Sequence, residues 1–140
     1  MTTLQMIMPV SLDPQFEEKV QVIQTLAKEY RFQARLPIPT GREPEFDLQK
    51  TIDELNNVDA IVVDLSFERP SCYYELGIAE ALGLQVFVIS LAGSHIHQTS
   101  HKKNVQFYKD LTDYKKILID VIKKCRLTAL PADAPKEICA

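Results

Sequence analysis

The chain has 140 residues, of which 46% are hydrophobic and 25% charged, and it carries a net charge of −3 at pH 7. These values are typical of one globular domain, and the negative balance excludes a nucleic-acid polymer from the expected partners. No apolar run approaches the ~18 residues of a membrane span and no signal-peptide pattern opens the sequence, so we expect a cytoplasmic protein without a membrane partner.

Short apolar runs alternate with amphipathic segments along the first half of the chain, which predicts strands alternating with helices. Charged residues, including Lys19 and Lys28, separate the apolar positions of the first amphipathic segment. Asp47 is suited to cap a second helix, whose apolar stripe is Leu48, Ile52 and Leu55. The expected elements are a strand over 4–9, a loop over 10–14, a helix over 14–30, an edge strand over 31–38 and a helix from Asp47 to Asn57.

The second half contains the clearest local signals. The run Ala60–Val63 is too short for a helix and rich in β-branched residues, so it predicts a buried parallel strand that ends at Asp64. Pro70 and Ser71 are typical of a helix start, and Gly83 of a helix end. After that helix we expect a strand over 85–90, a polar loop over 92–104, a strand over 105–108, a helix over 112–124 and a tail.

This alternation predicts a single-domain α/β fold, a doubly wound, flavodoxin-like or Rossmann-like parallel sheet of five strands in the order 2-1-3-4-5. We place the domain at residues 1–128 and the tail at 129–140. Ligands of such sheets bind beyond the carboxyl ends of the strands, at the switch point between strands 1 and 3. The loops Pro9–Pro14 and Asp64–Pro70 should therefore face each other across a site.

Glu75 is the candidate reacting group at that site. Ile78, Ala79 and Leu82 follow it at helical spacing, so we expect all four side chains on the apolar face that packs on the sheet. The helix N-terminus would favour the ionised carboxylate, which suits a nucleophile. Alternatively, Glu75 complements the helix dipole or accepts a hydrogen bond from Tyr73 or a loop amide.

Other chemistry-bearing residues suggest competing sites. Cys72 lies at the same helix start, where the pKa of a thiol can fall, and a histidine from the loop over 95–101 could pair with it. His95, His97 and His101 could bind a metal, although we expect solvated histidines and no metal. The three cysteines have no Cys-x-x-Cys spacing and are expected to be free thiols: Cys72, Cys125 and Cys139.

The segment from Asp59 to Ser66, followed by the Tyr-Glu-Leu-Gly helix start that contains Glu75, resembles the nucleoside 2-deoxyribosyltransferase-like family. The opening Ile7-Met8-Pro9 is similar to that family's first strand. The likeness covers residues 4–124 in layout and 59–90 closely. It implies cleavage or transfer of the N-glycosidic bond of a nucleoside or nucleotide, with Glu75 attacking C1′ and Asp64 or Asp47 protonating the leaving base.

The sequence departs from the family pattern after the first strand. The family's transferases have an aromatic hydroxyl there, whereas this chain has Met8-Pro9-Val10-Ser11, so Ser11, Tyr73 or Tyr74 would take its place. The glycine- and arginine-rich phosphate loop of the monophosphate hydrolases is also missing, which leaves Arg42, Arg69 or the helix N-terminus near Ser71 to bind a phosphate. The substrate-binding candidates are Pro9, Ser11, Asp47, Arg69, Ser71, Tyr73 and Tyr74.

Two other functions remain open for this stretch. One is a TIR-like domain that hydrolyses NAD with the same glutamate, and the other is a non-catalytic module that binds or senses a nucleotide. Tyr73 and Tyr74 could stack on a base in each case. The resemblance implies no cofactor, and it implies a homodimer or larger homo-oligomer whose small-molecule partner is a nucleoside or nucleotide.

Overall fold

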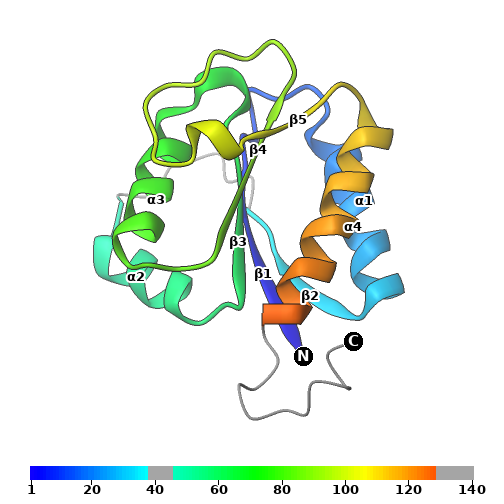
Figure 1. Cartoon of the computed structure of the whole chain (residues 1–140), viewed down its shortest axis with the longest axis horizontal. Helices are drawn as coiled ribbons and strands as arrows, with labels where there is room; N and C mark the ends of the chain where they lie inside the picture. The colour runs from blue at the N-terminus through cyan, green and yellow to red at the C-terminus, as the bar shows by residue number, and fades with distance from the viewer. Residues whose placement is uncertain (38–45, 129–140) are drawn as a thin grey trace.

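The alternating segments fold into a five-stranded sheet with two helices on each face (Figure 1). This computed structural model describes residues 1–37 and 46–128, so the predicted tail, Arg42 and Cys139 lie outside the described residues. Every neighbouring pair of strands is parallel and the order is β2-β1-β3-β4-β5, which confirms the predicted fold. In chain order the elements are β1 (Thr2–Ile7), α1 (Phe16–Tyr30), β2 (Phe32–Arg35), α2 (Leu48–Asn56), β3 (Ala60–Asp64), η1 (Ser66–Glu68), α3 (Pro70–Ala81), β4 (Val86–Leu91), η2 (Lys102–Asn104), β5 (Gln106–Tyr108) and α4 (Leu111–Thr128).

The central strand β3 is buried along its whole length, because helices cover both faces of a doubly wound sheet. Alternate side chains enter opposite cores: Ala60 and Val62 pack with α1 and α4, whereas Ile61 and Val63 pack with α2 and α3. No helix among the described residues has the length and apolar character needed to cross a membrane.

Helix α3 begins and ends where the local signals predict. Pro70 occupies its first turn, and Gly83 follows the C-cap with a φ of 70°. The amide of Gly83 donates to the Glu80 carbonyl and the amide of Leu84 to the Ala79 carbonyl, which is the Schellman arrangement that a glycine at this position permits. The chain therefore leaves the helix directly into β4.

The predicted phase of α3 is confirmed for Ala79 and Ile78, which pack on the core, and is wrong for Leu82. Its buried residues are Cys72, Leu76 and Ala79, whereas Leu82 is exposed and Glu75 is only half-buried. Apolar side chains surround this helix, so two neighbouring stripes have similar hydrophobicity and spacing alone does not choose between them. Glu75 therefore lies beside the sheet-facing stripe and not within it.

Candidate functional site

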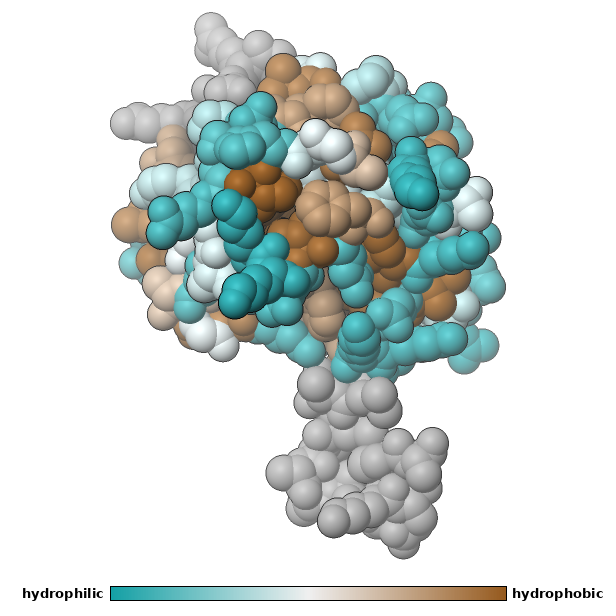
Figure 2. Space-filling view, turned by 45° about the horizontal axis from the view of Figure 1, so that its top comes forward, coloured by the Kyte–Doolittle hydropathy of each residue, from teal (hydrophilic) through white to brown (hydrophobic). Residues whose placement is uncertain are grey.

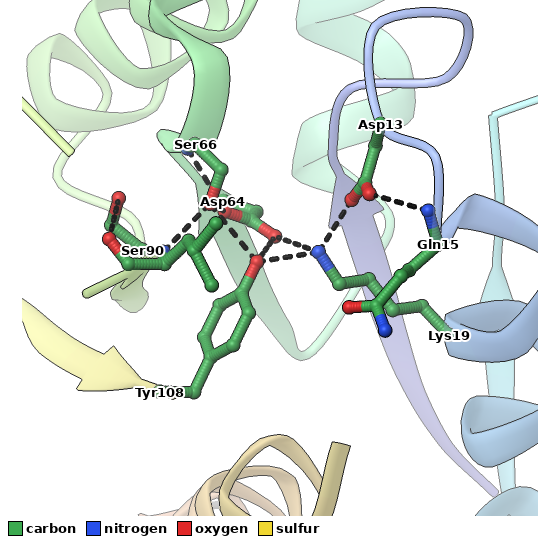
Figure 3. A network of polar contacts seen from close by, with 8 residues as sticks. Asp13, Gln15, Lys19, Asp64, Ser66, Ser90 and Tyr108 are labelled. Carbon is green, nitrogen blue, oxygen red and sulfur yellow. Dashed lines mark hydrogen bonds and ion pairs between the residues drawn. The ribbon is translucent and has the colours of Figure 1, made fainter. Parts of the chain in front are cut away.

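A buried polar network closes the carboxyl ends of the strands at the predicted switch point (Figure 3). Its centre is the Lys19 ammonium, which is 1% exposed and bonds to Asp13 of the loop after β1. The same nitrogen donates to the Tyr108 hydroxyl at 2.5 Å and lies 3.6 Å from an Asp64 oxygen. The rings of Tyr108 and Tyr114 lie 4.6 and 5.4 Å from this nitrogen, so the cation also contacts two aromatic faces.

Asp64 connects this cation to the two strands beyond β3. One of its oxygens accepts the Tyr108 hydroxyl at 2.7 Å, and the other accepts the Ser66 amide at 3.0 Å and the Ser66 hydroxyl at 2.6 Å. The Ser66 hydroxyl in turn accepts the amide of Leu91, at the end of β4, at 2.7 Å. The ends of β3, β4 and β5 are thus joined through side chains.

The network confirms that the loops after β1 and β3 face each other, since Lys19 bridges Asp13 and Asp64. It contains two carboxylates and one ammonium, all buried. Burial and the charge of Asp64 raise the pKa of Tyr108 well above its usual range, so this phenol stays a hydrogen-bond donor. Asp64 has no exposed surface, and its role as a proton donor stays a prediction.

Lys19 is the member of the network that the sequence analysis placed wrongly, among the charged residues that separate the apolar ones. Phe16, Lys19, Ile23 and Leu26 are the buried residues of α1 and follow one another at intervals of three, four and three. This spacing places Lys19 on the buried face of α1. The sequence analysis overlooked the spacing because lysine is charged. A lysine in an apolar stripe is buried only when it is paired, and here Asp13 and Asp64 pair it.

Glu75 lies in α3 at a half-buried position, and among the described residues no hydrogen bond or ion pair engages its carboxylate. Burial raises the pKa of Glu75 above its usual value. The Arg69 guanidinium lowers the pKa by a smaller amount, and the negative charge of Glu54 in α2 raises it further. The sequence analysis expected the helix N-terminus to favour the ionised carboxylate, whereas the net shift of the pKa is in the opposite direction because desolvation is the largest effect. The result is a carboxylate that is partly desolvated and unpaired within the described residues.

An apolar hollow of about 450 Å³ opens beside the start of α3. Its walls are Phe46, Pro70, Ser71 and Tyr74, and the Phe46 and Tyr74 rings meet edge to face with centroids 4.8 Å apart. Ser71 and Glu75 are one helical turn apart, so the carboxylate is a neighbour of the hollow on the helix surface. The hollow is mostly apolar and open to solvent, since Phe46 and Tyr74 are 47% and 55% exposed.

The remaining substrate-binding candidates have separate surroundings. Pro9 is buried and Ser11 is exposed, both in the loop after β1. Asp47 caps α2 as predicted, accepting the Lys50 amide at 3.0 Å. The Tyr73 hydroxyl accepts the His97 amide at 2.9 Å, so it anchors the loop after β4 and does not bond to Glu75.

Two features of the structure count against the competing cysteine site. Burial is the main cause that raises the pKa of Cys72 to about 12, so the expected decrease at the helix start does not occur. His97, from the loop proposed to activate it, instead pairs with Glu68 at 2.7 Å. Cys72 is a free thiol, as predicted.

Two histidines of the loop after β4, His97 and His101, bond to carboxylates near α3. His101 and Thr99 both contact Glu80 at 2.7 Å, and His97 bonds to Glu68. Within residues 1–37 and 46–128, no cluster of three or more His, Cys, Asp and Glu side chains has an arrangement that could hold a metal ion. These two histidines therefore attach the loop to α3.

Replacing Glu80 by glutamine tests this attachment. Burial raises the pKa of Glu80, but hydrogen bonds from Thr99 and His101 outweigh it and leave the pKa below its usual value. The stabilisation is therefore fully present above the unfolded-state pKa and is lost as the pH falls through the lower, folded-state pKa. We expect Glu80→Gln to lower the free energy of unfolding at pH 7 by about 1 kcal/mol. Denaturant unfolding at pH 7 and pH 3 should show this difference only at pH 7, whereas exposed Glu29→Gln should show it at neither.

Comparisons with known proteins identify the fold. No family model matches the sequence, and no curated protein matches it. Among solved structures, the chain is similar to the Francisella novicida lysine decarboxylase LdcF, with a TM-score of 0.59 and 17% sequence identity. The match establishes the Rossmann-like α/β fold. It covers 93% of this chain and 18% of that chain, so the chain spans less than a fifth of that enzyme.

Proposed function

We propose that this domain cleaves the N-glycosidic bond of a nucleoside or nucleotide, with Glu75 as the nucleophile and the hollow beside α3 as part of the substrate site. The observation that carries the proposal is the Glu75 carboxylate, which is half-buried, unpaired within the described residues and one turn from the hollow's Ser71 wall. A carboxylate that has lost part of its hydration is well suited to attack an electron-poor carbon. The likeness of the Tyr-Glu-Leu-Gly segment to nucleoside 2-deoxyribosyltransferase-like proteins supports the same role.

The proposed reaction has two steps. A Glu75 oxygen forms a bond to C1′ while the bond from C1′ to the base nitrogen breaks, and the base leaves with the bonding electrons and takes up a proton. Water then attacks C1′ of the glycosyl ester, which releases the sugar and returns the Glu75 carboxylate. In a transferase, a second base takes the place of this water.

Neither Asp47 nor Asp64 lines the hollow, and both accept hydrogen bonds, Asp47 from the Lys50 amide as the cap of α2. Asp47 follows Phe46 of the hollow directly and is exposed. Asp64 is fully buried and accepts hydrogen bonds from Tyr108 and Ser66. We therefore assign Asp64 to the positioning of the loop between β3 and α3 and keep Asp47, the more accessible of the two, as the candidate for proton transfer.

The test is release of free base by wild type and Glu75→Gln from a panel of nucleosides, nucleoside 5′-monophosphates and NAD, followed by mass spectrometry. Release of adenine or thymine by wild type alone supports the proposal. Release of nicotinamide from NAD alone would favour the NAD hydrolase instead. No release from any compound, with binding intact, would leave a nucleotide-binding module. Equal release by both proteins would show that Glu75 is not the nucleophile.

A further inference from the structure

The turn that joins β3 to α3 contains two consecutive residues with left-handed backbone. Phe67 has φ 63° and ψ 14°, and Glu68 has φ 53°. Residues other than glycine adopt this region rarely, and for a bulky aromatic residue it is costly. The turn between Ser66 and Arg69 is therefore a strained segment of the described chain.

Contacts on both sides impose this conformation. Ser66 is held by Asp64 and by the Leu91 amide, which fixes the beginning of the turn to the buried network. Glu68 bonds to His97 at 2.7 Å, which fixes its outer side to the loop after β4. The strain is therefore maintained by a framework that joins the ends of β3, β4 and β5.

Packing does not explain why a phenylalanine occupies this position. Phe67 is 37% exposed and belongs to neither of the two cores formed by the described residues. Leu12, in the facing loop after β1, is also exposed. Figure 2 turns this end of the molecule toward the viewer and shows hydrophobic side chains gathered at its centre with hydrophilic ones around them. Phe67 thus presents apolar surface at the edge of the sheet where ligands of this fold bind.

We infer that Phe67 is a substrate-contacting residue, held in a strained conformation so that its ring packs against the planar base of the bound nucleoside or nucleotide. The identity of the ligand rests on the proposed function. Phe67 lies three residues before Pro70, which forms a wall of the hollow beside Glu75. Aromatic rings stack on every base, and a ring that is already fixed loses little freedom on binding.

Two substitutions separate the ring from the strain. Phe67→Ala removes the ring and keeps the strained backbone, whereas Phe67→Gly removes both. We expect each to weaken the binding of adenosine 5′-monophosphate in calorimetry at least tenfold, or about 1.4 kcal/mol. In thermal unfolding, Phe67→Gly should melt roughly 3–5 °C above Phe67→Ala. Phe107→Ala, which removes an exposed ring from β5, should leave the affinity unchanged.

The results also separate this inference from the proposed function. The proposed contact between Phe67 and the base would be contradicted if both Phe67 variants bound adenosine 5′-monophosphate as tightly as wild type, or if wild type did not bind it. Equal melting temperatures of Phe67→Gly and Phe67→Ala would contradict the claim that the backbone at residue 67 is strained. Weaker binding by both Phe67 variants, together with no base release by wild type, would support the contact and count against the glycosidic reaction alone.

Discussion

Replacing Lys19 by methionine is expected to lower the free energy of unfolding by about 3–5 kcal/mol, because it leaves Asp13 and Asp64 buried without their shared cation. Methionine has nearly the same length, so the main loss is the charge. The ammonium also bonds to Tyr108, whose hydroxyl would lose a donor in a site without water access. Urea unfolding followed by circular dichroism measures the change.

The matched control is Lys28→Met on the exposed face of the same helix. We expect its free energy of unfolding to stay within about 0.5 kcal/mol of wild type. Adding Asp13→Asn to Lys19→Met removes one of the uncompensated charges and should restore part of the loss. A Lys19→Met protein as stable as the Lys28→Met protein would contradict the described role of the network.

Glu75→Gln is expected to have opposite effects on activity and stability. If Glu75 is the nucleophile, as proposed, its removal should lower the rate of base release about 10³-fold or more. The same change should raise the melting temperature at pH 7 by roughly 1–3 °C, because a half-buried carboxylate with a raised pKa destabilises the folded state when it is ionised.

The pH dependence gives the sign of this effect. The folded state holds the Glu75 proton more tightly than the unfolded chain, whose pKa is the usual 4.5. Wild type therefore loses stability relative to Glu75→Gln as the pH rises from 4.5 through the higher folded-state pKa, and the two converge below pH 4.5. Scanning calorimetry from pH 4 to 8 checks this. A variant that is less stable than wild type at pH 7 would show that the carboxylate makes favourable contacts.

Local signals were sufficient for most of the fold. The β-branched run over Ala60–Val63 is stable as a central strand of a sheet that helices cover on both faces. The backbone preferences of Pro70 and Gly83 determine where α3 begins and ends. The strand order followed from the right-handed crossovers that parallel strands need. Each of these inferences depends on residues close together in the chain, which is why the sequence sufficed.

The interior of the site depends on pairs that are distant in sequence. Lys19 meets Tyr108 across 89 positions, and Tyr108 meets Asp64 across 44, so no local pattern shows that these polar groups satisfy one another. The orientation of Glu75 could not be predicted for a different reason. Apolar residues lie on several sides of α3, so their spacing does not show which side of the helix faces the sheet. The left-handed backbone of Phe67 and Glu68 has no glycine to signal it.

The most direct test of the central claim is the rate of base release from nucleoside 5′-monophosphates at pH 7, measured side by side for wild type, Glu75→Gln and Glu80→Gln. Both variants remove one negative charge from α3, but only the first alters the carboxylate beside the hollow. The proposed function predicts a rate for Glu80→Gln within about threefold of wild type and a loss of about 10³-fold or more for Glu75→Gln. Equal rates for wild type and Glu75→Gln would contradict the claim that Glu75 is the nucleophile.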